Sequence, residues 1–379
     1  NSEETLVATQ ATVTWELKTG NIEHVIAGGV EFSRETSNPT FSFGIGASGT
    51  SLLTPNSQMP FTGSTDPRII SDTTGQTSAV YVLDTIKFND NWQLTAGGRW
   101  DQFDTDYDAV RFKGPATPFN SGELDGNESF NQTDKEGSYR AALVYKPTLE
   151  SSIYLAGSTS FNPSAQGLSL LTTGRGLGLG NQHLDPEKNQ SLEAGVKINL
   201  NEGALSFAGS VFEILKKNAR VADPNNPGFN TLGGEHQVRG ISLDMNGMVG
   251  PGLFLTAGYS HLDTEVTKAA PGAAIGAALA NAPEHSLSLW INYQFNERLD
   301  FGIGARHISD LLAQNTGNGK SVPSYQLLDG MGRYVLSDTV SLKLNATNLT
   351  NEYYFDQLHP WHIVPGPGMT ITFALNVIF

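Results

Sequence analysis

The sequence has no cysteine, so neither a disulfide framework nor a cysteine-ligated metal site contributes to its stability. It has no run of about 18 apolar residues, which excludes a membrane-spanning helix. Basic residues are scarce, since 23 Lys and Arg stand against 38 Asp and Glu, for a net charge of −15. Because phosphate binding requires a basic stripe, nucleic acid is not expected as a partner.

Sequence signatures of catalysis are also missing. The chain has eight histidines and many serines, but no G-x-S-x-G elbow and no H-E-x-x-H motif. The glycine-rich stretch TTGRGLGLG at 172–180 lacks the strand and helix that would make it a phosphate loop, and we interpret it as a loop. We therefore expect neither an enzyme nor a protein-bound cofactor.

The clearest pattern that is present has a period of two. In MTITFALNVIF at 369–379, apolar side chains alternate with threonine, alanine and asparagine, which predicts a strand. About fifteen such segments occur, near 7–17, 22–35, 76–88, 91–104, 137–146, 151–161, 189–200, 204–219, 236–249, 253–265, 285–295, 299–309, 324–335, 339–349 and 368–379. No helical stretch competes with them, so the chain is expected to be all-β.

The connections between these segments alternate strictly in length. Short turns lie near 18–21, 89–91, 147–150, 201–203, 250–252, 296–298 and 336–338. Long loops rich in Gly, Pro, Asn, Ser and Asp lie near 36–75, 105–136, 162–188, 220–235, 266–284, 310–323 and 350–367. An up-and-down meander places all short turns at one rim and all long loops at the other.

Aromatic residues mark the ends of the apolar faces. Trp92 and Trp100 bracket one such face, as the aromatic girdles of membrane barrels do. These patterns predict one domain over 1–379, an antiparallel up-and-down transmembrane β-barrel with short periplasmic turns and long extracellular loops. A soluble sandwich or propeller is the alternative, but neither has a reason to keep every second connection long.

Fifteen strands cannot close an antiparallel meander, because the first and last would meet in parallel. The chain also starts NSEETLV, without the basic and apolar regions of a signal peptide. We therefore expect a partial barrel, with further strands missing.

Several stretches resemble the C-terminal part of TonB-dependent outer-membrane receptors, most closely the catecholate-siderophore type. These stretches are LVATQATVTWELKTGNIEHVIAGGVEFSRE at 6–35, QTSAVYVLDTIKFNDNWQLTAGGRWD at 76–101, SFNPSAQGLSL at 160–170, LDPEKNQSLEAGVK at 184–197, LNATNLTNEYYFDQLHPWHIVPGPG at 344–368 and the terminal strand with Phe379. The resemblance implies a 22-strand barrel in a Gram-negative outer membrane, whose last strand pairs with its first. The plug and the energy-coupling segment of the family are absent from this sequence.

The resemblance also implies the function and the partners. The expected activity is uptake of ferric catecholate-type siderophores, energised by the TonB–ExbB–ExbD complex through the missing plug. Iron would arrive as the siderophore complex, and outer-membrane lipid and lipopolysaccharide would surround the barrel. The alternative is a passive porin-like channel for small anionic or polar solutes, and a barrel-borne hydrolase would need a nucleophile and base that the sequence does not show.

Ferric catecholates are anionic and aromatic, so their site is expected to use arginine and aromatic side chains. The first candidates are His359, Trp361 and His362 in HPWH at 359–362. Alternatively, the neighbouring prolines stiffen this loop and Trp361 packs inward. The two histidines lack an acidic or cysteine partner nearby in sequence, so no metal site is predicted.

Four arginines complete the predicted ligand-binding set. Arg175 lies in the glycine-rich loop and is either a ligand contact or solvated. By alternation, Arg99, Arg140 and Arg306 point into the lumen, where they would form a cationic path. The alternative is that they pair with lumen carboxylates such as Glu31, Asp101 and Glu193, or with the plug.

The acidic stretch DQFDTDYD at 101–108 has a spacing that could collect calcium. It lacks the glycine and the distal glutamate of an EF-hand. We interpret it as the solvated base of a loop.

Overall fold

The computed structural model describes residues 2–46, 49–51, 53–113, 124–163, 184–222, 230–269, 274–313, 320–358 and 363–378, and all its regular elements are strands. They are β1 (Glu4–Thr19), β2 (Ile22–Ser37), β3 (Thr40–Ile45), β4 (Ser64–Lys87), β5 (Trp92–Phe112), β6 (Leu124–Thr148), β7 (Ser151–Asn162), β8 (Glu187–Leu200), β9 (Leu205–Ala222), β10 (Asn230–Gly250), β11 (Leu253–Lys268), β12 (His285–Asn296), β13 (Leu299–Ile308), β14 (Leu311–Leu312), β15 (Ser321–Val322), β16 (Tyr325–Ser337), β17 (Val340–Thr347), β18 (Phe355–Leu358), β19 (Ile363–Pro365) and β20 (Thr370–Val377). None of the described residues belongs to a helix that could span a membrane.

One sheet holds 16 of these strands, in the order β1-β2-β4-β5-β6-β7-β8-β9-β10-β11-β12-β13-β16-β17-β20, with β3 added beside β4. The path strands correspond one to one with the predicted segments, and each pairs antiparallel with its chain neighbour. The all-β meander is therefore confirmed. The short hairpins β14–β15 and β18–β19 form within segments that the sequence predicted as loops.

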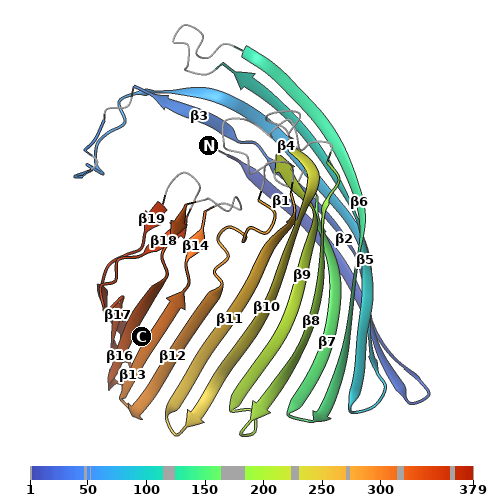
Figure 1. Cartoon of the computed structure of the whole chain (residues 1–379), viewed down its shortest axis with the longest axis vertical. Helices are drawn as coiled ribbons and strands as arrows, with labels where there is room; N and C mark the ends of the chain where they lie inside the picture. Colours follow the sequence, from blue (N-terminus) through green and yellow to red (C-terminus); the bar gives the residue numbers. More distant parts are fainter. Residues whose placement is uncertain are drawn as a thin grey trace.

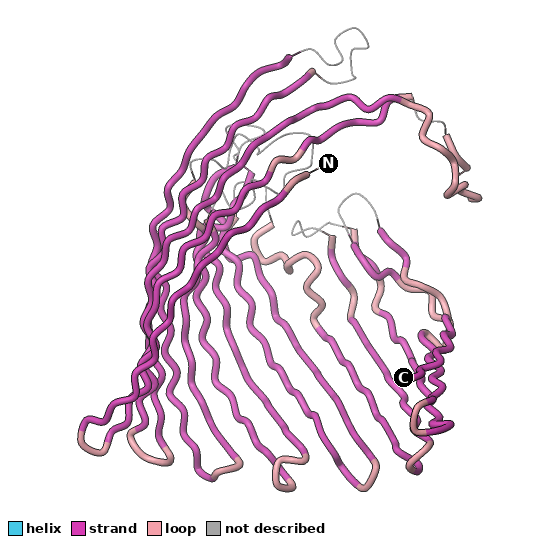
Figure 2. The backbone as a smooth tube through the Cα atoms, turned by 180° about the vertical axis from the view of Figure 1, so that it is seen from behind, coloured by secondary structure: helices cyan, strands magenta, loops and turns pink. Residues whose placement is uncertain are grey.

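The sheet curves into an open trough (Figure 1). Strands β1 and β20 form the two free edges of the described sheet: β1 pairs only with β2, and β20 pairs only with β17. The short connections gather at one end of the strands (Figure 2), which we call the turn rim; the opposite end is the loop rim. The total of 22 strands and the pairing of last strand with first stay predictions.

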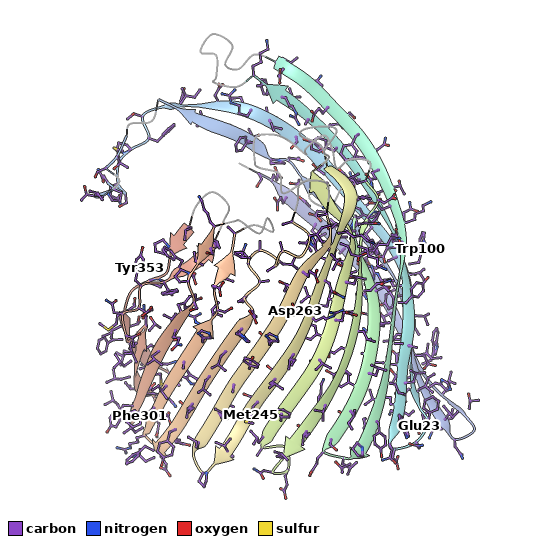
Figure 3. All side chains as sticks on the ribbon, in the orientation of Figure 1. Glu23, Trp100, Met245, Asp263, Phe301 and Tyr353 are labelled. Atoms are coloured by element: carbon purple, nitrogen blue, oxygen red, sulfur yellow. The ribbon has the colours of Figure 1, made fainter. Side chains whose placement is uncertain are left out.

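The two faces of the sheet differ in polarity. On one face, large apolar side chains are exposed: Trp92, Trp100, Val80, Leu155 and Ile303 are between 41% and 55% exposed. Figure 3 shows Trp100 on the outside of the bend formed by β4, β5 and β6. The other face carries charged groups such as Asp101, which is 7% exposed. We call these the apolar face and the polar face, and lipid is the environment that suits the former.

Strands β4, β5 and β6 extend far into the segments predicted as loops at 36–75 and 105–136, so those loop boundaries are wrong (Figure 1). The extension has its own core, in which Ile69, Tyr107 and Ala109 are buried against Phe41, Phe103 and Phe130. The pair Arg111–Glu128 joins β5 to β6 with an N–O distance of 2.8 Å.

The stretch DQFDTDYD is thus part of strand β5 and not the base of a loop. Strand alternation places Asp104, Asp106 and Asp108 on the face opposite Tyr107 and Asp101. The aspartates do not converge on one point, so the calcium reading has no geometric support. Beyond Trp100 the acidic residues take the positions that the apolar face held before, which explains why the segment looked like a loop in the sequence.

Glycines on the polar face let aromatic side chains lie flat across the neighbouring strand. Four aromatic residues stand directly opposite a glycine in the strand register: Tyr81 opposite Gly29, Tyr154 opposite Gly195, Phe212 opposite Gly240 and Trp290 opposite Gly304. A Cβ atom added to Gly29 would lie 2.6 Å from the Tyr81 hydroxyl, and one on Gly195 would lie 2.5 Å from that of Tyr154. Only glycine leaves room for these rings.

Candidate functional site

A hollow of about 400 Å³ lies on the polar face where β2, β4, β5, β6 and β7 run side by side. Its lining on this face consists of Gln10, Ala27, Tyr81, Leu83, Gly97, Arg99, Ser138, Arg140 and Ser158. Two of the sequence-predicted arginines, Arg99 and Arg140, therefore meet at one place. Gly97, which also lines the hollow, stands opposite Arg140 in the register, and a Cβ atom there would lie 2.7 Å from the side chain of Leu83.

Arg99 is held by two carboxylates. Its Nε donates to Asp101 Oδ1 at 2.8 Å, its Nη2 lies 2.7 Å from the same oxygen, and its Nη1 lies 2.9 Å from Glu31 Oε2. The guanidinium also lies over the ring of Tyr81, 5.9 Å from its centroid. The predicted pairing with Glu31 and Asp101 is confirmed, and its main consequence is to fasten β2 to β5 across β4.

Tyr81 forms the aromatic wall of the hollow. Gln10 Nε2 donates to its hydroxyl at 2.7 Å, and the hydroxyl of Thr12 lies 2.5 Å away. The ring thus reaches from β4 over Gly29 of β2 to β1. Sequence reasoning missed Tyr81 because both faces of segment 76–88 carry apolar residues, so alternation alone did not assign it to the polar face.

Arg140 differs from Arg99 in its partners. Its side chain is exposed, and it makes no ion pair with any residue in the described part of the chain. Ser138 and Ser158 line the same hollow, and the hydroxyl of Ser158 lies 2.7 Å from that of Ser191. A guanidinium with unused donors, beside a tyrosine ring and hydroxyl groups, suits an anionic aromatic ligand.

Replacing Arg99 by methionine is expected to lower the free energy of unfolding by about 1–2 kcal/mol, because Glu31 and Asp101 would face each other without a cation. The loss is smaller than for a fully buried pair, since Arg99 and Glu31 are each 31% exposed. Urea unfolding of the detergent-solubilised barrel measures the change. The same substitution at Arg140 is the control and should leave the midpoint unchanged; equal losses would contradict the structural role assigned to Arg99.

Arg306 stands apart from this hollow, on β13, opposite Leu327 of β16. Nearby, the rings of Tyr325 and Tyr354 contact each other in a tilted arrangement, with centroids 4.7 Å apart and an interplanar angle of 40°. Burial raises the pKa of Tyr354, whereas the positive charge of Arg306 acts in the opposite direction. Arg306 makes no ion pair with a described residue. Because it lies on β13, away from Arg99 and Arg140, the predicted cationic path would consist of two separate positively charged sites.

Glu193, the third predicted carboxylate partner, accepts a hydrogen bond from the hydroxyl of Tyr154. The expectation that it pairs with one of the three arginines is therefore wrong. Lys197 lies over the same tyrosine ring, 5.5 Å from its centroid. Tyr154 occupies this position because Gly195 faces it across the strands.

Further charges lie on the polar face at the loop rim. Glu187, at the start of β8, is 7% exposed; Lys216 Nζ lies 2.8 Å from it, and the Arg220 amide donates to it at 3.1 Å. Burial alone would raise the pKa of Glu187, but these two contacts hold the pKa below its usual value. At neutral pH this carboxylate is thus charged and compensated.

The other predicted site residues, Arg175, His359, Trp361 and His362, lie outside the described residues. Strand β18 ends at Leu358 and β19 begins at Ile363, and these two residues pair with each other. The roles of these four side chains stay predictions.

Asn348 in the motif NLTNEYY was not predicted as a functional residue, yet it is 2% exposed. Its backbone amide donates to Asp329 at 2.8 Å, and its side-chain amide donates to the carbonyls of Glu352 at 2.9 Å and Pro367 at 3.1 Å. Its Oδ1 accepts from the Glu352 amide at 2.8 Å. Asn348 therefore joins three segments around β17, just before β20.

Comparisons with known proteins agree with this architecture. A model of the family described as "TonB dependent receptor-like, beta-barrel" matches residues 2–349. The metal-pseudopaline receptor CntO of Pseudomonas aeruginosa is 28% identical over 379 residues, covering 97% of this chain and 50% of the relative. The probable TonB-dependent siderophore receptor PiuA of Acinetobacter baumannii is 29% identical over 397 residues, covering 97% and 52%.

Solved structures share the fold. The closed form of the ferric-catecholate import receptor Fiu from Escherichia coli K12 superposes with a TM-score of 0.86 at 21% identity, covering 100% of this chain and 55% of that one. The PiuA structure from Acinetobacter baumannii gives a TM-score of 0.84 at 27% identity, covering 99% and 56%. The chain spans about half the length of the curated relatives it matches.

Proposed function

Because the chain belongs to the TonB-dependent receptor-like β-barrel family, we propose that it forms the wall of an outer-membrane receptor for ferric siderophores of the catecholate type. Barrels of this family are proteins of the Gram-negative outer membrane. The apolar face meets lipid and lipopolysaccharide, and the loop rim faces outward. Iron reaches the wall as the siderophore complex, with no side chain binding the metal directly.

One observation carries the ligand class. On the polar face, the exposed guanidinium of Arg140 shares a hollow with the ring of Tyr81, while Arg99 beside it is already paired. An anionic catecholate would receive hydrogen bonds from Arg140 and ring contacts from Tyr81. The name of one relative, the catecholate siderophore receptor Fiu of Escherichia coli K12, supports the same class, and that of PiuA supports a siderophore in general.

Transport would be energised by the TonB–ExbB–ExbD complex acting through a plug. A passive porin-like channel for small anionic or polar solutes is not favoured, because the family match is to receptors. Uptake of a defined ferric catecholate, measured in iron-limited cells with and without the energising complex, separates the two. Uptake that persists without the complex would exclude the receptor.

Replacing Arg140 by alanine is expected to weaken binding of a ferric catecholate about tenfold, since a hydrogen bond to a charged group contributes roughly 1.5–3 kcal/mol. Quenching of tryptophan fluorescence in the complete purified protein measures the dissociation constant. Arg333→Ala is the matched control, because Arg333 pairs with Asp300 at 3.1 Å away from the hollow. Equal affinities for the Arg140 variant and the unaltered protein would remove Arg140 from the site.

A further inference from the structure

A second cluster of ligand-type side chains lies on strands β11 and β12, away from the hollow. His261 and His285 stand directly opposite each other in the strand register, and their rings stack with centroids 4.8 Å apart. Glu284 precedes His285, and its Oε1 lies 3.5 Å from His285 Nε2. One donor atom from each of the three residues lies within 4.8 Å of the others.

The cluster belongs to the apolar face. Strand alternation puts His285 on the same side as Leu287, which is 41% exposed, and the same alternation puts Tyr259 beside His261. Figure 3 labels Asp263, two residues beyond His261 on this face; it lies above Met245 and Phe301, toward the loop rim. The histidines therefore stand at the upper margin of the apolar band, outside the polar conduit.

We propose that His261, His285 and Glu284 bind a divalent transition-metal ion such as Zn²⁺ or Cu²⁺. Two imidazole nitrogens and one carboxylate oxygen form a ligand set that suits these borderline ions, with open positions for water. The three ligand atoms lie within 4.8 Å of one another, slightly farther apart than ligand atoms bound to the same ion. Small rotations of the three side chains would bring them to binding distance.

The hydrogen bonds around the histidines leave donor atoms for the metal. The hydroxyl of Tyr259 lies 3.0 Å from His285 Nδ1; in the tautomer with the proton on Nδ1 the hydroxyl accepts it, and Nε2, on the Glu284 side, is left to bind the ion. Nδ1 of His261 is buried and has no hydrogen-bond partner in the described structure. An imidazole nitrogen without a partner is costly unless something binds to it.

The position gives such an ion a mechanical effect. His261 and His285 form the last register pair between β11 and β12; beyond it β11 continues to Lys268 beside β10, and its other edge is hydrogen-bonded to the connection, with Val266 bonded to Gly276 and Ala277. The chain between the two strands runs from 269 to 284. An ion held by both strands binds only when β11 and β12 are paired, so its binding free energy stabilises this end of the strand pair.

Binding is tested on the complete protein, purified in detergent without a histidine tag, by competition for Zn²⁺ with a chromophoric chelator. We expect one Zn²⁺ per chain, an affinity loss of about 100-fold for His261→Ala or His285→Ala, and about tenfold for Tyr259→Phe, which acts through His285. His307→Ala is the matched control, because His307 is on the same face of β13 and its Nδ1 lies 3.2 Å from the Tyr325 carbonyl.

Electron paramagnetic resonance of the Cu²⁺-loaded protein gives an independent result that needs no variant. Coupling to two imidazole nitrogens is expected. Coupling to one or none would overturn the proposal, as would Zn²⁺ binding that is unchanged in His261→Ala and His285→Ala or reduced equally in His307→Ala. Because the site lies outside the hollow, siderophore binding should be the same with and without Zn²⁺.

Discussion

Gly29→Ala is expected to reduce the yield of folded barrel sharply and to lower the free energy of unfolding by about 3 kcal/mol. The added Cβ would meet the carbonyl oxygen of Ala11 and lie 2.6 Å from the Tyr81 hydroxyl. The backbone of β1 cannot move away without breaking its pairing with β2, so the ring of Tyr81 must lift and lose Gln10 and Thr12. Overpacking of this kind costs about 1–3 kcal/mol before the lost hydrogen bonds are added.

The neighbouring residue provides a matched control. A Cβ on Gly28, on the opposite face of the same strand, would lie 3.6 Å from the nearest atom, which is ordinary contact. Gly28→Ala should therefore fold like the unaltered protein. The folded fraction is measured by the shift in electrophoretic mobility between heated and unheated samples. If the two variants behaved alike, strand propensity rather than the crossing of Tyr81 would explain the effect.

Asn348→Ala is expected to cost a similar amount, about 3 kcal/mol. The substitution removes the side-chain bonds to Glu352 and Pro367, so three backbone groups lose their partners. It also places alanine at φ = 52°, a conformation that asparagine tolerates better. Because Pro367 lies just before β20, we expect the last strand to lose protection first, as measured by amide hydrogen exchange.

Asn345→Ala is the control for this prediction. Asn345 lies on the same strand, β17, and its side chain makes no hydrogen bond with a described residue. Its replacement should leave both the unfolding midpoint and the exchange of β20 unchanged. Loss of stability in Asn348→Ala without faster exchange in β20 would show that Asn348 acts locally and does not hold the terminal strand.

The sequence predicted the strand order because every path strand has period two and each short turn fixes its neighbours. It failed at β4, β5 and β6, where polarity changes along the strand: the apolar face ends at Trp100, and Asp104 and Asp106 follow on the same side. Above that point the buried residues, including Tyr107, lie on the other face. When the apolar residues move from one face of a strand to the other, the alternation is interrupted, and the sequence then predicts a loop.

Site residues were predictable only where the alternation within a single strand determined their position. Alternation placed Arg99 and Arg140 on the polar face, but it did not predict the hollow between them, which is also lined by Tyr81 from another strand. The pairing of His261 with His285 was out of reach, because their strands are joined by a long connection whose length does not set the register. No metal site was predicted for this reason.

The aromatic rings that lie over glycines also bear on how the barrel assembles. Each ring stands opposite its glycine in the native strand register, and at Gly195, Gly240 and Gly304 a slip by one residue in either direction would place a residue with a side chain opposite the ring. The four aromatic–glycine pairs are spread along the sheet, so misaligned strands would be destabilised at several places while the sheet folds. The packing of aromatic rings over glycines would thus favour the correct strand register during folding of the sheet.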